Sequence, residues 1–406
     1  MAEKVTVIGS GPAGLMAALT AAAAGYDVAV LEYLPQSGRK LLASGAGKCN
    51  FTNMLEPESM AERFAPEQRK FVRPALLGFT PGDVREFFAV RGLKYKLVDD
   101  FYCFPVSEKA SDILQILQDE LFARGGRILC NTPVTDLQLQ DNRISGVFSN
   151  EKFFPCDYLI AAAGGPGFPR LGGHSSLDKI FSKYNISMVR RTPALCGIKS
   201  SDPWLQDLAG IVLDNTTLTL DKKNTTQGTL LFTGSGFSGP ATLDISGRVA
   251  KELEAGKKVV LLLNLSPEKT VDDWLNILNN ARKENGKRLV RNLFTHHLPQ
   301  AVAYAAVQAA GIGDCIAAVL SRSMQDRLLE TLTQCRVNVS AVENWDKAMA
   351  STGGVDRKQV NSRTMQSREI GNLYLAGEFI DVDGPCGGYN IQWAFSSGRL
   401  AGMLKK

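Results

Sequence analysis

The first residues of the chain follow a pattern of apolar and polar positions that predicts a strand, a helix and a second strand. Residues 5–8 form a short apolar run, residues 12–24 are rich in alanine, and residues 28–31 are apolar again. Gly25 follows the alanine-rich segment, where a glycine commonly ends a helix. A turn with the spacing G-x-G-x-x-G joins the first strand to the helix. This order of elements is the beginning of a Rossmann-type α/β fold.

The glycines of that turn each have a physical task in a dinucleotide site. Gly9 permits the tight turn, Gly11 lets the backbone approach a pyrophosphate, and Gly14 lets the helix pack closely on the strand. The helix N-terminus directs unpaired N–H groups at the phosphates. Glu32, after the second strand, can accept hydrogen bonds from a ribose diol. The segment predicts a site for an adenosine dinucleotide without a 2′-phosphate, and it fits FAD and NAD equally.

The pattern further along the chain extends this fold. Residues 111–124 carry apolar positions at helical spacing and are followed by two glycines. Alternating segments on both sides of residues 141–142 predict a hairpin. Residues 158–163 are typical of a buried strand, and they lead into a glycine-rich turn at residues 164–167. By analogy of fold, this order of elements matches the wiring of flavin-binding Rossmann domains.

From residue 192 the pattern changes to short strands. Residues 218–220 alternate before the polar turn 221–224, and residues 230–232 and 259–263 are further strand candidates. After residue 266 helical spacing returns, including an apolar stripe that recurs every four residues from Ile316 to Leu332. We therefore expect a discontinuous Rossmann-type domain, residues 1–191 and 343–406, with an insert that consists of a β-rich subdomain, residues 192–265, and a helical subdomain, residues 266–342.

Composition narrows the function classes. The 406 residues are 44% hydrophobic and 21% charged, which is ordinary for a soluble globular protein. The net charge of +5 comes from cations spread along the chain, which favours a solvated surface over a nucleic-acid site. None of the 8 cysteines forms a C-x-x-C pair, so we expect no metal site. The early first strand and the absence of any run of about 18 apolar residues predict a cytoplasmic protein without a membrane span.

Two more glycine-rich segments have the character of ligand-binding loops. Residues 33–53 combine glycines with basic side chains, and such a loop brings backbone and cations close to phosphates. Residues 377–390 follow a predicted strand at 373–376 and lead into a terminal helix at 391–403. Both segments are therefore candidates for the surroundings of a large nucleotide cofactor.

Seven segments resemble one family of flavoproteins. They are GRKLLASGAGKCNFTN at residues 38–53, FP at 104–105, AAAGGPGFP at 161–169, LFTGSGFSGPA at 231–241, STGGV at 351–355, TMQSR at 364–368 and LYLAGEFIDVDGPCGGYNIQWAFSSGRLAG at 373–402. The family they resemble includes YhiN and BaiN and is described as NAD(P)/FAD-dependent oxidoreductases or the aminoacetone oxidase family. The resemblance implies bound FAD, a Rossmann-type domain in discontinuous pieces, and an insert made of a small β-barrel and helices.

The resemblance and the glycine turn together assign the expected FAD contacts. The adenosine end is expected at the turn and Glu32, with backbone contacts to adenine from Val134. The ribityl–pyrophosphate end is expected at Gly377 and Asp383, with Glu378 as an alternative acid. The isoalloxazine is expected at the start of the last helix, whose N-terminus stabilises negative charge on a reduced flavin. The full set is Gly9, Gly11, Pro12, Ala13, Gly14, Glu32, Arg39, Lys40, Gly45, Gly47, Asn50, Val134, Ala163, Gly164, Gly377, Glu378, Asp383, Gly388, Tyr389, Asn390 and Ile391.

The sequence also departs from the family pattern, as a divergent member would. Phe101 and Tyr102 stand where the family usually carries Gly-Arg, and residues 233–236 read Thr-Gly-Ser-Gly instead of Thr-His-Tyr-Gly. Residues 172–176 replace an expected Gly-Ser-Thr-Gly-Asp-Gly stretch, and Cys386 stands where threonine is common. These changes concern the polar groups around the substrate and leave the expectation of FAD intact.

The motifs predict an FAD-dependent oxidoreductase in which reduced flavin N5 passes hydride to an activated C=C bond of a small apolar molecule. No second nucleotide-binding pattern is visible, so NAD(P)H, as a transient electron donor, would enter the substrate cavity and leave again. Candidate catalytic groups are Tyr389 and Tyr102, as proton donors, and Cys386, as a group that tunes the flavin. The three histidines do not assemble into a Ser-His-Asp set.

Three other functions fit parts of the sequence. Oxidation of an amine by oxygen uses the same flavin motifs. An FAD-dependent RNA-modifying or RNA-binding protein is suggested by five cations within residues 282–291, although a solvated helix face explains them better. A flavin-bound sensor without turnover is the third alternative, which the departures at Phe101, Gly234 and His174 make harder to dismiss.

Overall fold

The structure is a computed structural model that describes residues 2–404, with Gln206 described by its backbone alone. Contacts divide the chain into a discontinuous unit, Met1–Arg191 with Ala350–Lys406, and an inserted unit, Thr192–Met349. Each unit has a hydrophobic core of its own.

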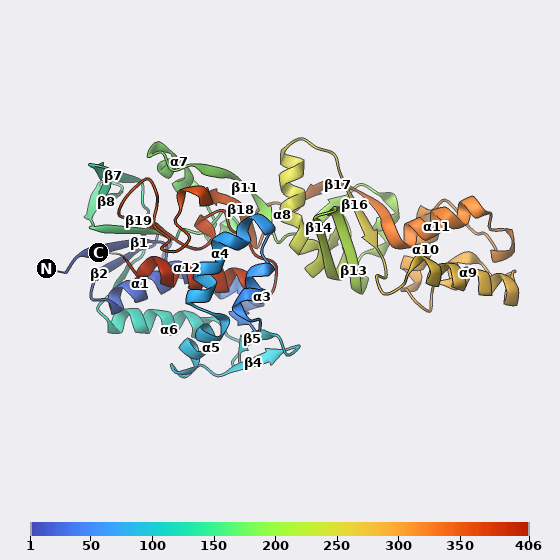
Figure 1. The fold of residues 1–406 in the computed structure, drawn as a ribbon, viewed down its shortest axis with the longest axis horizontal. Helices are drawn as coiled ribbons and strands as arrows, with labels where there is room; N and C mark the ends of the chain where they lie inside the picture. Colours follow the sequence, from blue (N-terminus) through green and yellow to red (C-terminus); the bar gives the residue numbers. More distant parts are fainter. Residues whose placement is uncertain (1, 405–406) are drawn as a thin grey trace. The chain divides into compact units, whose positions relative to one another are not determined.

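A five-stranded parallel sheet lies at the centre of the discontinuous unit (Figure 1). Its strands read as continuous apolar runs because helices and loops cover both faces. In spatial order they are β19 (Leu373–Leu375), β10 (Tyr158–Ala161), β1 (Lys4–Ile8), β2 (Asp27–Leu31) and β6 (Arg127–Leu129), all parallel. The carboxyl ends of β1, β2 and β10 therefore meet at one edge, where ligands bind in sheets of this kind.

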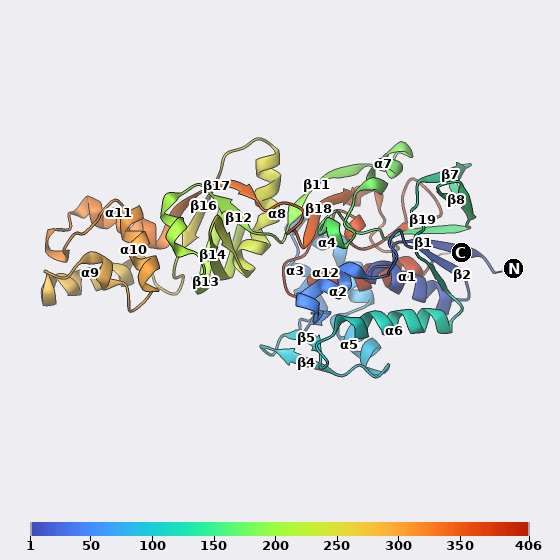
Figure 2. The ribbon, with the colours of Figure 1, turned by 180° about the vertical axis from the view of Figure 1, so that it is seen from behind.

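Two helices from opposite ends of the chain pack against each other beside this sheet. They are α1 (Pro12–Ala23) and α12 (Tyr389–Gly402), which run side by side in Figures 1 and 2. Glycines make the close approach possible, because a Cβ on Gly398 would lie 2.3 Å from the carbonyl oxygen of Ala13. A Cβ on Gly402 would lie 2.4 Å from that of Ala17. A third helix, α6 (Ala110–Ala123), packs on α1 from another side.

The remaining elements of the discontinuous unit form smaller layers. The hairpin predicted at residues 141–142 is confirmed, and both of its turn residues have positive φ. Helix α5 begins at Pro81, and the side chain of Thr80 caps it. The elements are helices α2 (Arg39–Ala43), α3 (Pro57–Glu62), α4 (Pro66–Gly78), α5 (Pro81–Ala89) and α7 (Ser176–Lys183); a sheet of β3 (Thr52–Asn53), β5 (Tyr102–Pro105) and β4 (Tyr95–Val98); a sheet of β7 (Asp136–Gln140), β8 (Arg143–Ser149) and β9 (Lys152–Pro155); and the pair β11 (Met188–Ala194) and β18 (Ala350–Val355).

The inserted unit contains a closed six-stranded barrel, as the resemblance implied. Around the barrel the strands are β12 (Ile198–Ser200), β15 (Gly236–Ser238), β14 (Asn224–Thr233), β13 (Val212–Asp221), β16 (Val259–Asn264) and β17 (Cys335–Val342). Helix α8 (Pro240–Glu254) packs on β14. The helical part comprises α9 (Val271–Asn285), α10 (Gln300–Ala309) and α11 (Arg322–Gln334).

Two features of the inserted unit differ from the expectation. Residues 335–342, expected in a helical region, form the sixth barrel strand, and their burial alternates strictly over Cys335–Ser340. The apolar stripe that begins at Ile316 does not belong to one long helix. Ser321 caps α11 by accepting a hydrogen bond from the amide of Met324, so the helix begins at Arg322.

None of the helices among residues 2–404 is long and apolar enough to cross a bilayer.

Candidate functional site

The glycine turn after β1 has the geometry of a phosphate-binding loop. Gly9 has φ of +96°, and a Cβ there would lie 2.6 Å from the carbonyl oxygen of Ala162 on the neighbouring strand. A Cβ on Gly14 would lie 1.9 Å from the carbonyl oxygen of Gly9. A Cβ on Gly11 would have no atom within 4 Å. Gly9 and Gly14 are therefore required by packing, whereas Gly11 faces open space that a ligand can enter.

Helix α1 begins directly behind that open space. Pro12 is its first residue, no side chain caps its N-terminus, and its first turn carries no acidic residue. The first N–H groups of the helix and the positive end of its dipole are thus available to an anion.

Glu32 lies at the end of β2 with its carboxylate held in a fixed orientation. Its Oε2 accepts hydrogen bonds from the amide and hydroxyl of Ser10, at 2.9 Å and 2.5 Å, and its Oε1 accepts one from the amide of Leu34 at 2.9 Å. A carboxylate oxygen can accept two hydrogen bonds, so Oε1 retains one position for a hydroxyl group. The amide of Thr132 donates to the backbone oxygen of Glu32 at 2.8 Å, which places the following Val134 close by.

An aromatic contact covers this end of the site. The rings of Tyr33 and His174 meet edge to face with centroids 4.3 Å apart, and His174 Nδ1 lies 2.8 Å from the hydroxyl of Ser176. Burial lowers the pKa of His174 below its ordinary value, which keeps the ring neutral near pH 7. The sequence does not predict this contact, because residues 33 and 174 carry no shared motif.

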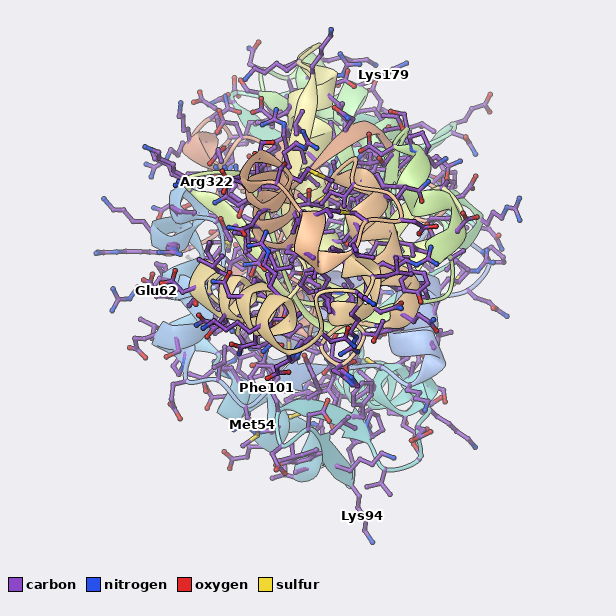
Figure 3. All side chains as sticks on the ribbon, turned by 90° about the vertical axis from the view of Figure 1, so that its right-hand side faces the viewer. Met54, Glu62, Lys94, Phe101, Lys179 and Arg322 are labelled. Atoms are coloured by element: carbon purple, nitrogen blue, oxygen red, sulfur yellow. The ribbon has the colours of Figure 1, made fainter. Side chains whose placement is uncertain are left out.

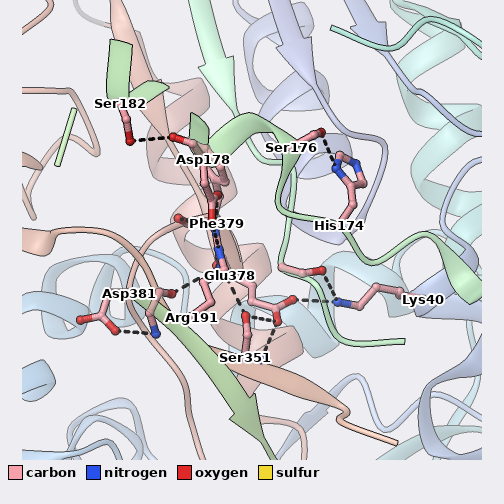
Figure 4. A network of polar contacts seen from close by, with 12 residues as sticks. Lys40, His174, Ser176, Asp178, Ser182, Arg191, Ser351, Glu378, Phe379 and Asp381 are labelled. Atoms are coloured by element: carbon pink, nitrogen blue, oxygen red, sulfur yellow. Dashed lines mark hydrogen bonds and ion pairs between the residues drawn. The ribbon is translucent and has the colours of Figure 1, made fainter. Parts of the chain in front are cut away.

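A half-buried ion-pair network lies beside the turn that follows β10. Lys40 Nζ donates to Glu378 Oε2 at 3.0 Å and to the carbonyl of Gly165 at 3.3 Å (Figure 4). Glu378 Oε1 accepts from the amide and hydroxyl of Ser351 at 2.8 Å and 3.0 Å. Burial raises the pKa of Glu378, but Lys40, Arg191 and the hydrogen bonds together outweigh it and hold the pKa below its ordinary value.

Arg191 connects this network to the rest of the unit. Its side chain is 4% exposed and forms a two-pronged ion pair with Asp178, with Nε–Oδ2 at 2.7 Å and Nη2–Oδ1 at 3.1 Å. Its remaining N–H groups donate to the carbonyl oxygens of Gly353, Glu378 and Phe379 at 3.2–3.4 Å (Figure 4). Arg191 therefore fixes the backbone of the short turn Gly377–Phe379, on which Glu378 is carried.

The start of α12 is a second uncapped helix terminus. Gly388 precedes it with φ of +86°, and no side chain caps the first turn. Asn390 holds the loop ahead of the helix, because its Oδ1 accepts from the amide of Gly384 and its Nδ2 donates to the carbonyl of the same residue, both at 2.8 Å. The terminus is thus held rigidly with its dipole directed outward.

Strand β3 is joined to this terminus by side-chain amides and hydroxyls. Asn53 Nδ2 donates to the carbonyl of Gly387 at 3.0 Å, and Thr52 Oγ1 donates to Gln392 Oε1 at 2.6 Å. The side-chain oxygen of Asn50, with its amide oriented to satisfy its neighbours, accepts from the amide of Gly388 at 3.2 Å. Segments about 330 residues apart in the sequence thus build one loop system.

Comparison with known proteins identifies the family. The model of the HI0933-like protein Rossmann domain matches residues 3–404. The chain belongs to the HI0933-like family. Ribosomal RNA dihydrouridine synthases of Haemophilus influenzae and Escherichia coli are each 30% identical, over 96% of this chain and 95% of theirs. The 3-dehydro-bile acid delta(4,6)-reductase of Clostridium scindens is 29% identical over 98% of both chains. Among solved structures, 3-ketosteroid delta1-dehydrogenase from Sterolibacterium denitrificans has the same fold, with a TM-score of 0.51, 12% identity and 99% of both chains covered.

Membership in the HI0933-like family confirms the resemblance, the α/β fold class and the enzyme class, which is that of FAD-dependent oxidoreductases. The residues present fit an FAD. Two uncapped helix starts, at α1 and α12, lie in one unit and pack against each other. The open space at Gly11 suits a pyrophosphate, and the oriented carboxylate of Glu32 suits a ribose.

The structure places the expected contacts of this HI0933-like protein in three groups. Gly9, Gly11, Pro12, Ala13, Gly14, Glu32 and Val134 lie at the carboxyl ends of β1 and β2 or just beyond β6, and Ala163 and Gly164 follow β10. Arg39, Lys40, Gly45, Gly47 and Asn50 lie on α2 and in the loop before β3. Gly377, Glu378, Asp383, Gly388, Tyr389, Asn390 and Ile391 lie between β19 and the start of α12.

The two acids proposed for the ribityl end have different surroundings. Glu378 belongs to the network with Lys40, whereas Asp383 accepts a hydrogen bond from Gln68 Nε2 of α4 at 3.0 Å. Among the candidate catalytic groups, Tyr389 is 4% exposed and packs against Phe64. Tyr102 and Cys386 are both half-buried, and Tyr102 lies against Gly387, which follows Cys386 in the loop before α12.

Several residues of the site escaped the sequence reasoning. Arg191, Asp178 and Ser351 carry the network around Glu378, but only Ser351 stands in a segment that the family shares. The glycine at position 165 is the one sequence feature that reflects this network. A Cβ on Gly165 would lie 2.2 Å from Ser351 Oγ and 2.7 Å from Glu378 Oε1. A glycine without a positive φ indicates here that a neighbouring side chain occupies the space of its Cβ.

Proposed function

We propose that this protein reduces a C=C bond conjugated to a carbonyl group, using bound FAD and electrons from NAD(P)H. The observation that carries the proposal is that full-length relatives of two kinds are named for different substrates. Formation of dihydrouridine saturates the C=C bond of uracil next to its carbonyl group, and a delta(4,6)-reductase of a 3-dehydro-bile acid saturates C=C bonds conjugated to a ketone. The substrates differ, but the reaction named is the same.

The residues of the chain have separate tasks in this reaction. The first turn of α1 and Gly11 hold the pyrophosphate, and Glu32 and Val134 hold the adenosine. Lys40 and Glu378, fixed by Arg191, bind polar groups of the ribityl–pyrophosphate portion. The N-terminus of α12, positioned by Asn390, supports negative charge at the isoalloxazine. Bound FAD supplies hydride transfer, which no protein side chain can provide.

The second hydrogen must arrive as a proton at the carbon next to the carbonyl. Tyr102 is better placed to deliver it than Tyr389, because Tyr102 is half-buried whereas Tyr389 is 4% exposed and packs on Phe64. NAD(P)H would use the substrate cavity in turn, because the parallel sheet around β1 is the single parallel sheet in the described part of the chain.

Our first candidate substrate is a small apolar molecule, and uridine in RNA is the second. The second rests on the two relatives that act on ribosomal RNA. The basic segment at residues 282–291 gives it limited support. Arg282 donates to Gln325 Oε1 at 2.8 Å and to the carbonyl of Leu320 at 2.7 Å, and Arg291 pairs with Asp314. Arg288 donates to the carbonyl oxygen of Asn292 at 3.2 Å, so three of the five cations are engaged with groups of the inserted unit itself.

The test begins with the purified protein under anaerobic conditions. We expect FAD by mass, bleaching of the flavin absorbance on addition of NADH or NADPH, and reoxidation by 2-cyclohexen-1-one or a larger cyclic enone. Ribosomal RNA from cells lacking the gene is the parallel substrate, with dihydrouridine measured by mass spectrometry. Failure of both nicotinamides to bleach the flavin would refute the reductase proposal and favour amine oxidation by oxygen or a sensor.

A variant pair tests the cofactor site by itself. Gly11→Val should leave the fold intact, because the Cβ at this position meets no atom within 4 Å, yet it should abolish FAD binding. Gly78→Val, which also meets no atom within 4 Å but lies at the end of α4, is the matched control and should keep FAD. Stoichiometric FAD in Gly11→Val would contradict the assignment.

A further inference from the structure

The sheet formed by β3, β5 and β4 brings one aromatic residue directly to the start of α12. Asn53 of β3 pairs with Tyr102 of β5, and the Asn53 side chain donates to the carbonyl of Gly387 at 3.0 Å. A Cβ on Gly387 would lie 2.9 Å from Tyr102 Cε1. Gly387 also has φ of +116°, which disfavours any side chain. The ring of Tyr102 therefore lies on the backbone of the loop that precedes α12.

Two more apolar side chains extend this surface. The rings of Phe101 and Tyr102 meet edge to face with centroids 4.9 Å apart, and the amide of Met54 donates to the carbonyl of Phe101 at 3.1 Å. Met54 is 39% exposed, and Phe101 and Tyr102 are only half-buried. Met54 and Phe101 are close together in Figure 3. We call Met54, Phe101 and Tyr102 the aromatic platform. Half-buried aromatic rings beside a flexible apolar side chain offer a ring-shaped ligand both a stacking face and an adaptable neighbour.

The charges around the platform select against a polyanion. Asp99 and Asp100 precede Phe101 directly, both are exposed, and neither takes part in an ion pair among residues 2–404. On the same sheet, Lys96 is neutralised by Glu108 at 2.5 Å. One cation, Arg85, is engaged with the backbone, because its Nη1 donates to the carbonyl oxygen of Asn53 at 2.7 Å. The two exposed carboxylates repel the phosphates on which binding of nucleic acid depends. A neutral molecule incurs no such repulsion.

We propose that the aromatic platform is the specificity-determining surface of the substrate site, and that it binds a flat, uncharged, unsaturated ring system by stacking on Tyr102. This inference rests on the proposed reduction of a conjugated C=C bond and specifies its substrate class. Planar conjugated rings gain from contact with aromatic faces beyond the burial of their area. Methionine adapts to rings of different outline, which suits a surface that must fit a substrate closely.

The test is a binding titration that does not depend on turnover. The probe is 4-androstene-3,17-dione, a flat uncharged enone, added to the FAD-loaded protein and followed by the change in flavin absorbance. We expect saturable binding by the unaltered protein and at least a tenfold increase in Kd for Tyr102→Ala. Tyr102→Phe retains the ring and should stay within about twofold. Phe122→Ala removes an aromatic side chain that is 50% exposed on α6, and this control should not change Kd.

Several outcomes would overturn the inference. An unchanged Kd in Tyr102→Ala that has a full complement of FAD would do so, as would a failure of the unaltered protein to bind the probe. If Tyr102→Ala fails to fold, Phe101→Ala and Met54→Ser provide the same test. Tight binding of a ribosomal RNA hairpin that strengthens in Asp99→Lys/Asp100→Lys would assign the surface to RNA. Loss of probe binding in Tyr102→Ala together with no reduction by NAD(P)H would leave the platform standing and refute the proposed reaction.

Discussion

The two units of the molecule bury different kinds of side chain. In the discontinuous unit the interior holds carboxylates and amides, with Glu32 and Asp381 below 9% exposure and Asn53, Gln68, Asn372 and Gln392 at 1% or less. In the inserted unit the buried polar side chains among the described residues are hydroxyls only: Thr192, Thr216, Thr242, Ser246 and Ser266. Buried charges and amides cost free energy unless they are fully paired.

The difference shows which unit is built for chemistry. The costly groups of the discontinuous unit hold its loops together, including those at the start of α12. The inserted unit has an apolar barrel core of the kind that maximises stability. Substitutions in the two units should therefore have different consequences, even when they reduce the free energy of unfolding by similar amounts.

The largest effect is expected from Gly14→Val in the discontinuous unit. Its Cβ would lie 1.9 Å from the carbonyl oxygen of Gly9, and backbone on both sides cannot yield. We expect a loss of more than about 3 kcal/mol and no FAD binding. Differential scanning calorimetry should show loss of one transition while that of the inserted unit remains. Gly11→Ala is the control for stability alone, because its Cβ meets no protein atom, and normal unfolding of Gly14→Val would contradict the packing argument.

Phe232→Ala tests the inserted unit by truncating a buried side chain, whereas Gly14→Val adds one. Phe232 is 0% exposed in the barrel core, and its truncation should reduce the free energy of unfolding of that unit by about 3–5 kcal/mol. FAD content should not change, because no polar group that holds the cofactor is touched. Loss of FAD together with the barrel transition would show that the two units do not unfold separately.

Arg191→Met should reduce the free energy of unfolding less than Phe232→Ala does, but it should weaken FAD binding more. It leaves Asp178 unpaired and frees the turn that carries Glu378, at a cost of about 2–3 kcal/mol. We expect weaker FAD retention, measured by absorbance after gel filtration. Arg127→Met is the matched control, since its ion pair with Asp27 is 56% and 34% exposed and should be worth less than about 1 kcal/mol. Equal effects of the two substitutions would contradict the role given to burial.

Glu378 gives the discontinuous unit a pH dependence that arises from its contacts with Lys40, Arg191 and Ser351. Its pKa in the folded protein lies below the ordinary value of 4.5, so its contribution to stability is present above about pH 4.5 and is lost as pH falls through the folded pKa. Thermal unfolding measured from pH 7 to pH 3 should show the transition of the discontinuous unit falling. Glu378→Gln should flatten that dependence, and an unchanged slope in this variant would contradict the assignment.

The smallest effects are expected from two matching helix caps, one in each unit. Thr80 and Asp83 form a capping box at the start of α5, and Thr270 and Asp273 form the same box at the start of α9. Thr80→Ala and Thr270→Ala should each cost about 1 kcal/mol. Each substitution should move only the transition of its own unit, and movement of both transitions by either one would indicate that the units are thermodynamically coupled.

The sequence predicts those parts of the fold that are determined by local patterns of residues. The period-two and helical patterns, the glycine turn and the hairpin at residues 141–142 each determine a local conformation, so the sheet and its first helix follow from the sequence alone. Strand β17 was missed because its alternation follows a helical stretch directly, and only its pairing with β12 and β16 shows that it belongs to the barrel. The apolar stripe from Ile316 to Leu332 predicted a longer helix than α11, which begins at Arg322. The cap at Ser321 interrupts the stripe, which continues on both sides of it.

The site was predictable in its motifs but not in its connections. Lys40 and Glu378 both stand in segments shared with the family, yet 338 residues separate them and no pattern indicates that they pair. Arg191 has no local signature, since a buried arginine is recognised only by its partners. The assignments of individual residues to FAD remain predictions, for which the Gly11 and Arg191 variants are the first tests.

The packing of α1 on α12 has a consequence for the order in which the protein can be made. The glycine turn leaves the ribosome early, but the helix that completes its unit emerges only after the entire inserted unit has been synthesised. At a synthesis rate of roughly 5–20 residues per second, the first helix waits for tens of seconds for its partner. The inserted unit is continuous and can fold in that interval, so the cofactor-binding half begins first and finishes last.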